Sequence, residues 1–321
     1  MKRKILIISL LLGSFCISSQ AGIDSPAVSG SAAEAGSAAE AGSPAVPDSV
    51  AESGSVTEAG LLGGPDSLTM PVIDWECRTI SEGITLRSAV TTLFNSAQAV
   101  YVLEIDTAGG TFELGVAVAG PPLATSAFAM QEEAIVAVNA TFFNMKEGYN
   151  MHYVKVDDSI VATTDEKEFG IRATGLFTAE GEAADISQWG PDREDAGVIT
   201  AGDAIVSGPL LIDDRIDMPL DSISFNTNRH PRTMVGITGS GHLLFVVVDG
   251  RQPGYAEGMS LFELRDLARS LGCTDALNLD GGGSTTMVVT GESGSAVLNK
   301  PSGKVERPVP SILFVRYENK N

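Results

Sequence analysis

The feature that most constrains this fold is a strand–helix–strand pattern. It consists of a run of apolar residues, a segment with marked helix ends and a second apolar run. Residues 243–248 are all apolar and predict a buried strand. Residues 260–272 predict a helix, because Ser260 and Glu263 match a capping box and Gly272 suits the C-terminal end. Residues 276–279 predict the next strand. Strand, crossover helix and strand predict a right-handed parallel unit.

Two carboxylates follow the two strands of this predicted unit. Asp249 comes directly after the first strand and Asp280 directly after the second. Parallel strands end at the same edge of a sheet, where open α/β sheets bind their ligands. We therefore expect both carboxylates at one site.

A glycine-rich turn follows Asp280, with the sequence DGGGSTT. Backbone N–H groups in such a turn can form an anion-binding nest, to which neighbouring hydroxyl groups add donors. The turn is no nucleotide P-loop, because it lacks the lysine and the spacing of that motif. The alternative is a β-bulge or a tight hairpin. The residues concerned are Gly281, Gly282, Gly283, Ser284 and Thr285.

Basic residues gather in two other segments, NRHPRT and DGRQPGY. Arg232 and Arg251 are candidates for bidentate contact with a phosphate. Arg229 suits a solvated loop paired with acidic neighbours. His230 can act as an acid or base or orient a phosphate oxygen, and the alternative is a satisfied hydrogen-bonding role.

The remainder of the chain indicates a β-rich domain. Short β-prone runs separated by glycine and aspartate turns continue from about residue 99 to 213. We expect an α+β fold: a β-rich single globular domain, residues 71–321, with a twisted mixed sheet and the strand–helix–strand parallel unit near its C-terminus. Asn139, which follows one predicted strand, can bind a sugar hydroxyl or cap a turn.

The first 70 residues predict export and a tether. Lys2, Arg3 and Lys4 precede a short apolar stretch and small residues, which is typical of a cleaved signal peptide, residues 1–21. The stretch is too short for a stable membrane span. Lipidation at Cys16 is the alternative. Residues 22–70, rich in Ala, Gly, Ser and Glu, predict a disordered tether, so the chain is expected in the periplasm, on the cell surface or secreted.

Charge and motifs exclude several classes. A formal net charge of −20 disfavours nucleic acid and anionic lipid as partners. The chain lacks HExxH, CxxC and GxSxG motifs, which removes support for zincins, zinc ribbons and α/β-hydrolases. Cys77 and Cys273 can pair or remain separate thiols. No cofactor is indicated, and a divalent metal held by the two carboxylates stays open.

The motifs from residue 139 onward resemble the phosphodiester glycosidase domain, the family of the mannose-6-phosphate uncovering enzyme and its bacterial relatives. The resemblance covers about residues 75–317 and rests on NATFF, AIVSGPLLIDD, RHPRTMVGIT, LLFVVVDGRQPGYAEGMSLFELRDLA, ALNLDGGGSTTMVV and LNKPSGKVERPVPSILFV. Ala140 stands where the family commonly has glycine.

The resemblance implies hydrolysis of a sugar-1-phosphodiester, such as an N-acetylglucosamine-α-phosphate ester, to free sugar and a phosphomonoester. The substrate would be a sugar-phosphate small molecule or a glycan polymer. The resemblance also implies which residues form the site: Asn139, His230, Arg232, Asp249, Arg251, Asp280, Gly281, Gly282, Gly283, Ser284, Thr285, Asn299 and Arg307.

Two carboxylates suit this chemistry, because glycoside cleavage passes through an oxocarbenium-like state. Asp280 is the expected nucleophile or general base, and Asp249 the acid, orienting group or metal ligand. Arginines and the glycine turn would stabilise the leaving phosphate. Three alternatives remain: a non-catalytic module that binds glycans or wall polymers, a metal-dependent phosphodiesterase, and a β-rich protein whose glycines only form turns.

Overall fold

The computed structural model describes residues 70–108, 111–195 and 197–318. The predicted signal peptide, Cys16 and almost all of the predicted tether therefore lie outside the described residues. Within these ranges strands predominate over helices, which confirms the α+β class. The described helices are all too short or too polar to cross a membrane.

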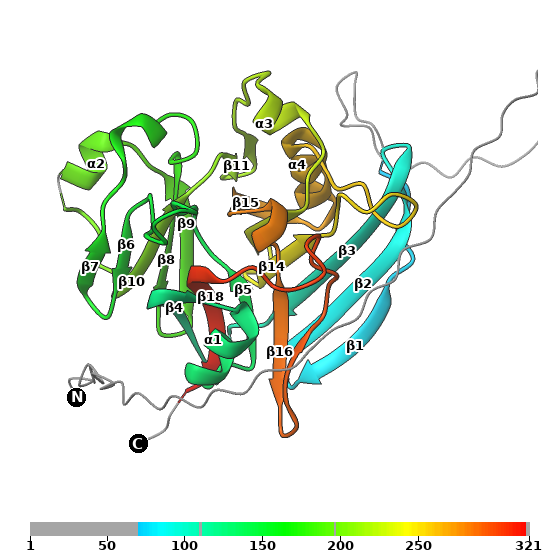
Figure 1. Ribbon diagram of the computed structural model, residues 1–321, viewed down its shortest axis with the longest axis horizontal. Helices are drawn as coiled ribbons and strands as arrows, with labels where there is room; N and C mark the ends of the chain where they lie inside the picture. Colours follow the sequence, from blue (N-terminus) through cyan, green and yellow to red (C-terminus); the bar gives the residue numbers. More distant parts are fainter. Residues whose placement is uncertain (1–69, 109–110, 196, 319–321) are drawn as a thin grey trace, which may run out of the picture. The chain divides into compact units, whose positions relative to one another are not determined.

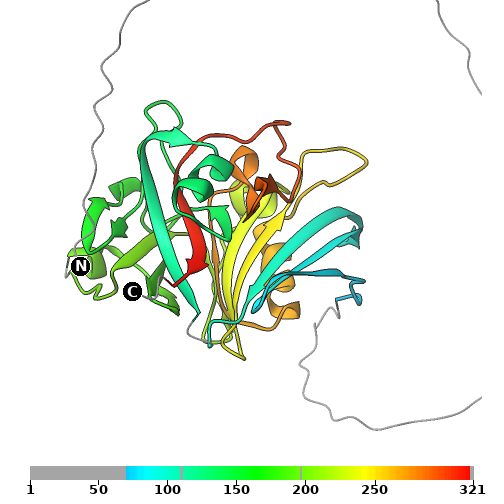
Figure 2. The ribbon, with the colours of Figure 1, turned by 90° about the horizontal axis from the view of Figure 1, so that it is seen from below.

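The largest sheet has eight strands, and each strand is antiparallel to its neighbours. Figure 2 shows β13 and β14, in yellow, beside β2 and β3, in cyan. In spatial order the strands are β1 (Glu76–Ser81), β2 (Ile84–Leu93), β3 (Ser96–Ile105), β14 (Leu243–Val248), β13 (Arg232–Thr238), β15 (Cys273–Asn278), β11 (Leu210–Asp213) and β12 (Ile216–Asp217).

Two five-stranded sheets accompany it (Figure 1). One contains β7 (Ser159–Ala162), β6 (Val154–Val156), β10 (Asp203–Ser207), β8 (Gly175–Glu180) and β9 (Ala183–Gln188). The other contains β17 (Gly294–Val297), β16 (Met287–Gly291), β5 (Val136–Asn139), β18 (Val309–Tyr317) and β4 (Phe112–Leu123). The helices are α1 (Thr125–Gln131), α2 (Pro191–Asp195), α3 (Ser224–Thr227) and α4 (Leu261–Ser270), with 3₁₀ turns η1 (Glu166–Glu168) and η2 (Gly282–Ser284).

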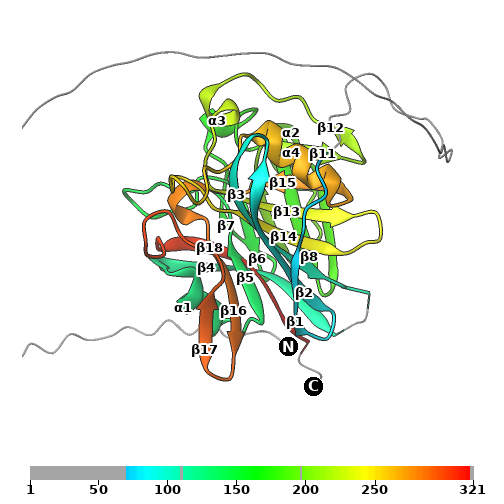
Figure 3. The same cartoon turned by 90° about the vertical axis from the view of Figure 1, so that its right-hand side faces the viewer.

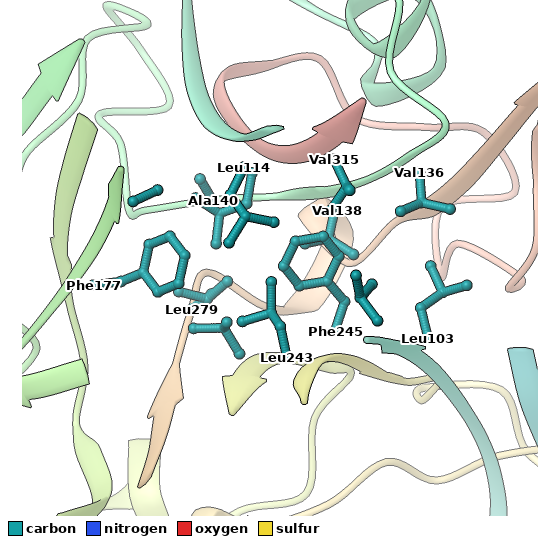
Figure 4. Packing of buried hydrophobic residues seen from close by; sticks show 14 of the residues in the cluster. Leu103, Leu114, Val136, Val138, Ala140, Phe177, Leu243, Phe245, Leu279 and Val315 are labelled. Atoms are coloured by element: carbon teal, nitrogen blue, oxygen red, sulfur yellow. The ribbon is translucent and has the colours of Figure 1, made fainter. Parts of the chain in front are cut away.

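Strand β14 is buried on both faces, which explains its unbroken apolar sequence. Successive side chains point to opposite faces of a strand. Phe245 and Val247 pack in a core with residues of β5 and β18 (Figure 4). Val246 and Val248 pack on the other face, in a core with residues of α4. The large sheet thus lies between the β5–β18 sheet and helix α4.

Helix α4 begins and ends as predicted. The Ser260 hydroxyl accepts a hydrogen bond from the Glu263 N–H at 3.2 Å, and the Glu263 carboxylate accepts one from the Ser260 N–H at 2.8 Å. Gly272 follows the helix with a φ of +84°, a conformation that favours glycine. Figure 3 shows α4 beside β11 and β15.

The predicted strand–helix–strand unit needs one correction. Strands β14 and β15 run in the same direction, but β13 lies between them and is antiparallel to both. Met234 of β13 is opposite Val246 on one side and Asn278 on the other. The large sheet therefore contains antiparallel neighbours where a mixed sheet was expected. The predicted common edge is retained, because β14 and β15 still end on the same side.

Leu264 provides a test of the core beneath α4. The side chain is fully buried in the cluster that joins the helix to the large sheet. We expect Leu264→Ala to lower the free energy of unfolding by about 2–5 kcal/mol, because it removes apolar contacts and leaves a cavity. Urea denaturation followed by circular dichroism measures this change. The exposed Val90→Ala is the control, with a change of about 0.5 kcal/mol or less.

Candidate active site

Four loops form the candidate site at the edge where β14 and β15 end. Hydrogen bonds between His230 and Met259 join the loop before β13 to the loop before α4. The Gly282 N–H donates to the Pro231 carbonyl at 2.9 Å, which ties the glycine turn to the first of these. The Lys300 N–H donates to Asp249 at 2.9 Å and brings in the loop between β17 and β18. The loops therefore hold one another in a fixed arrangement.

Asp280 is the carboxyl at the centre of this arrangement. Its Oδ1 accepts a hydrogen bond from the Gly281 N–H at 2.9 Å, and its own N–H donates to the Ala140 carbonyl. Burial raises the pKa of Asp280 to about 6, against the opposing effects of the Ser284 hydroxyl and the Arg307 charge. A carboxyl with this pKa can exchange a proton near neutral pH.

Asp249 lies at the predicted edge but does not present a free carboxylate. Its side chain is 1% exposed and accepts hydrogen bonds from three groups. These are the Asn299 amide at 2.9 Å, the Lys300 N–H at 2.9 Å and the Tyr255 hydroxyl at 3.1 Å. Burial raises the pKa of Asp249, and these donors oppose the rise. The geometry suits an orienting role better than a role as acid.

His230 is partly buried, and its tautomer follows from its neighbour. Nδ1 lies 3.3 Å from Nη2 of Arg251. Because a guanidinium only donates, Nδ1 must accept, and the proton of the neutral ring is on Nε2. Burial lowers the pKa of His230, with further lowering by the charges of Arg232 and Arg251. A neutral His230 can donate a hydrogen bond from Nε2.

Arg251 and Arg307 lie over the glycine turn. Neither arginine forms an ion pair with any residue that the structure describes, whereas Arg229 pairs with Glu257 and Glu263 as expected for a solvated loop. Arg307 Nη1 lies 3.4 Å from the Ser284 hydroxyl. Two unpaired guanidinium groups in a strongly acidic chain are suited to an anionic ligand.

Arg232 is placed differently from the prediction. Its side chain is 2% exposed and donates to the carbonyls of Met259, Phe225 and Asn228. Burial lowers the pKa of Arg232 to about 9, and the charge of Arg251 acts in the same direction. The guanidinium thus braces the loops beneath His230 instead of lying open to a ligand.

The three glycines make room for the protein's own groups. A Cβ on Gly281 would come within 2.6 Å of the Pro231 carbonyl oxygen. A Cβ on Gly282 would come within 3.2 Å of Nη1 of Arg251, and one on Gly283 would overlap the Arg307 guanidinium. The space that side chains would fill at these three positions is thus occupied by other groups of the protein.

Most backbone N–H groups of the predicted anion nest donate hydrogen bonds to acceptors of the protein itself. Gly281 donates to Asp280, and Gly282 donates to the Pro231 carbonyl. Ser284 and Thr285 donate to carbonyls inside the turn, because Gly282–Ser284 forms a 3₁₀ turn. Among the described residues, only the Gly283 N–H of this turn has no acceptor.

Two buried asparagines hold the turn in place. Asn139, fully buried, accepts from the Thr233 hydroxyl and the Thr286 N–H and donates to the Asp280 carbonyl at 2.6 Å. Asn299 is 5% exposed and donates to Asp249 and to the Thr285 carbonyl. Both amides therefore contact protein groups, and neither is placed as a direct ligand for a sugar. The Thr285 hydroxyl is buried and has no partner among the described residues.

Sequence reasoning missed Arg172, whose charge lowers the pKa of Asp280. Arg172 lies shortly after η1, and both Nε and Nη2 bind Glu168, at 2.8 and 2.9 Å. The sequence carries no motif here, and the only signal is the four-residue spacing of an acid and an arginine.

The sequence left open whether Cys77 and Cys273 pair, and both are free thiols. His242, away from the site, pairs with Glu104 at 2.8 Å. Burial raises the pKa of Cys273 to about 12. Within the described ranges, no group of three His, Cys, Asp or Glu residues is placed to hold a metal ion.

Comparison with known proteins agrees with the family resemblance seen in the sequence. Residues 132–316, more than half of the chain, match the sequence model of the phosphodiester glycosidase family. A mouse N-acetylglucosamine-1-phosphodiester alpha-N-acetylglucosaminidase is 26% identical over 167 residues, 49% of this chain and 32% of the relative. An uncharacterized SPbeta prophage-derived protein, YomE, of Bacillus subtilis is 35% identical over 89 residues, 28% of this chain and 13% of the relative. The chain thus spans a third or less of these relatives.

Two solved structures share the fold. The zebrafish N-acetylglucosamine-1-phosphodiester alpha-N-acetylglucosaminidase catalytic domain superposes with a TM-score of 0.58 and 16% identity, covering 78% of this chain and 85% of that chain. A hypothetical protein from Synechocystis gives a TM-score of 0.58 and 17% identity, covering 77% and 64%.

The glycine turn gives a test that separates folding from ligand contact. Gly281→Ala places a methyl group against a backbone carbonyl, and we expect it to lower the free energy of unfolding by about 1–3 kcal/mol. Gly283→Ala meets the far end of the flexible Arg307 side chain, so it should displace that guanidinium at about 1 kcal/mol or less.

Thermal unfolding and titration with inorganic phosphate measure the two effects. We expect Gly283→Ala to weaken phosphate binding while its melting temperature stays near that of the wild type. Equal destabilisation by both substitutions, or unchanged phosphate binding in Gly283→Ala, would contradict the placement of Arg307.

Proposed function

Because the chain belongs to the phosphodiester glycosidase family, we propose that it hydrolyses a sugar-1-phosphodiester. Water breaks the bond between the anomeric carbon and the phosphate oxygen, which releases free sugar and a phosphomonoester. The observation that carries this proposal is Asp280, a carboxyl held among the loops of the site, whose pKa burial raises to about 6 against the charges of Arg307 and Arg172.

Asp280 would act in its ionised form next to the anomeric carbon. As nucleophile it would attack that carbon, and as general base it would take a proton from the attacking water. Both roles require the carboxylate, so both predict the same pH dependence. Asp249 would hold Asn299 and Lys300, and through them the glycine turn, in the active arrangement.

The leaving phosphate would be held by Arg251, Arg307 and His230. The two guanidinium groups have no carboxylate partner in the described chain, so their charge is available to the phosphate oxygens. A neutral His230 would donate its Nε2–H to the same group. Because a phosphate ester is already a good leaving group, stabilising its charge matters more than protonating it.

The basic n-region and apolar stretch at the N-terminus support export of the enzyme to the periplasm, the cell surface or the medium. A sugar-phosphate small molecule or a glycan polymer with sugar-phosphate links would meet it there. The acidic surface disfavours nucleic acid as a partner.

Product analysis tests the reaction with Asp280→Asn as the key variant. We expect wild type to convert at least one member of a panel of sugar-1-phosphodiesters, including an N-acetylglucosamine-α-phosphate ester, to free sugar and phosphomonoester. Asp280→Asn should lower kcat by about a hundredfold or more, because it removes the base or nucleophile.

The variant must be folded for this comparison. Asp280 has a pKa raised from 3.8 to about 6, so its ionisation destabilises the folded state as pH rises through this interval. Asp280→Asn should therefore be more stable than wild type at pH 8, by up to about 3 kcal/mol, and equal to it below about pH 4.

Other products would point to the other candidates. Sugar-1-phosphate as product, lost on addition of chelator, would identify a metal-dependent phosphodiesterase. Saturable binding with no turnover of any ester would identify a binding module. Full turnover in folded Asp280→Asn would remove Asp280 from the mechanism.

The pH dependence follows from the same carboxyl. We expect kcat/KM of the wild type to rise with pH through an apparent pKa near 6, because the reactive form of Asp280 is ionised. Initial rates in buffers of constant ionic strength measure the profile. A rate that falls through pH 6 as pH increases would make Asp280 an acid and contradict the assigned role.

A further inference from the structure

A cavity of about 450 Å³ lies close to the candidate site. It is bounded by the segments on both sides of Arg172 and by residues that flank Phe225. Its lining mixes apolar surface with hydroxyl, amide and carboxyl groups, from residues that include Ile171, Thr174, Pro209, Asp221 and Asn226. Such a mixture is suited to a neutral polyol, which offers both C–H faces and hydroxyl groups.

Asn226 gives this cavity an unused polar group. The side chain is 3% exposed, and its Nδ2 donates to the Asp221 carbonyl at 2.8 Å. That bond fixes the amide, and its Oδ1 has no partner among the described residues. A buried acceptor without a donor is costly, so a ligand hydroxyl or N–H at this point would stabilise it.

Two hydrogen bonds connect the wall of the cavity to the strand that leads to Asp280, although Asp280 itself does not line the cavity. The Pro209 carbonyl accepts from the Asn278 N–H, and the Gly208 carbonyl accepts from the Asn278 amide at 2.7 Å. Asn278 is two residues before Asp280. A Cβ on Gly208 would also come within 2.9 Å of the Arg172 carbonyl, so the arginine segment packs against the same wall.

Arg172 is held rigidly at this wall. Glu168, 3% exposed, binds its Nε and Nη2, and the guanidinium packs over Phe142 and Phe225 at 5.3 and 5.8 Å. His152 lies behind Glu168, with Nε2 3.6 Å from its carboxylate. The Nη1 group makes no hydrogen bond within the described chain, and the side chain is 34% exposed.

The hydrogen bonds behind Glu168 also determine which ring nitrogen of His152 carries a proton. The Thr141 hydroxyl donates to the Val206 carbonyl at 2.6 Å. It must therefore accept from Nδ1 of His152, which lies 3.1 Å away. Nδ1 of His152 therefore carries a proton, and this bond fixes the ring between Thr141 and Glu168.

Ion pairing separates the arginines into two kinds. Arg172 is paired with the Glu168 carboxylate, which holds it as a fixed hydrogen-bond donor. Arg251 and Arg307 have no carboxylate partner in the described chain and carry free charge. A paired arginine suits a sugar hydroxyl, and an unpaired arginine suits a phosphate.

From these observations we propose that the cavity binds the sugar unit whose anomeric carbon Asp280 attacks. Arg172 donates from Nη1 to a sugar hydroxyl, and Asn226 Oδ1 accepts from a hydroxyl or N–H. Glu168 and His152 are positioning residues that act through Arg172. The phosphate lies on the other arginines, Arg251 and Arg307. This inference rests on the proposed function and names where each half of the substrate binds.

Direct binding tests the proposal without turnover. The probes are free monosaccharides (N-acetylglucosamine, glucose, mannose and galactose), followed by saturation-transfer NMR, and inorganic phosphate, followed by calorimetry. The full chain is compared with Arg172→Gln, Ile171→Trp and Arg307→Gln. Ile171 is 48% exposed and lines the cavity, so a tryptophan there should fill it with little effect on folding.

We expect opposite effects on the two probes. Arg172→Gln and Ile171→Trp should weaken binding of the best monosaccharide by about tenfold and leave phosphate binding within about twofold. Arg307→Gln should weaken phosphate binding and leave sugar binding unchanged. Ile160→Trp, at an exposed position of β7, is the control and should change neither.

Several outcomes would overturn the proposal. These are no saturable binding of any monosaccharide to the wild type, unchanged sugar binding in Ile171→Trp, or loss of phosphate binding in Arg172→Gln. Glu168→Gln should weaken sugar binding as Arg172→Gln does, because it releases the guanidinium, and unchanged sugar binding in folded Glu168→Gln would contradict its positioning role. Because these arms need no turnover, a failed glycosidase assay with specific sugar binding would remove only the proposed reaction.

Discussion

The amide of Asn139 connects the large sheet to the β5–β18 sheet at the point where the chain passes from one to the other. Asn139 ends β5, Thr233 belongs to β13 of the large sheet, and the turn from Asp280 to Thr286 connects β15 to β16. One buried side chain on β5 thus bonds to both of the other segments. The position of Asp280 is therefore set by its backbone carbonyl and by the packing of both sheets, and its carboxyl is left free of that structural task.

Charge is distributed unevenly around this joint. Arg172 and Arg229 are bound by carboxylates, and Arg232 is bound by carbonyls. Arg251 and Arg307 have no such partners among residues 70–108, 111–195 and 197–318, and they lie over consecutive glycines. Arg251 also has a φ of +59°, a conformation that is uncommon for a residue with a side chain and that often marks a functional position. The acidic surface elsewhere makes this the natural place for an anion.

The sequence predicted the elements that depend on local patterns. Strand β14, helix α4 with its caps and the shared edge of Asp249 and Asp280 all follow from apolar runs and capping residues. The position of β13 between β14 and β15 depends on long-range pairing, which no local pattern records. Burial decides the roles of Asp249 and Arg232, and it too is set by segments distant in the chain. Arg172 was missed because its importance comes from Glu168 and from packing.

The glycine turn shows how one pattern can serve either of two structures. Three glycines permit close approach, but the sequence does not say what approaches. In this fold the Pro231 carbonyl and two guanidinium groups occupy the space. The proposed anion site therefore consists of the arginines and not of the backbone N–H groups.

This exchange has a consequence for Asp280. The Arg307 charge opposes the effect of burial on the pKa of the carboxyl. A phosphate bound to Arg307 would offset that charge and add its own, so the carboxylate would become less stable once substrate is bound. A less stable carboxylate is a stronger base, and the anion that the arginines recruit would thus activate the group that attacks beside it.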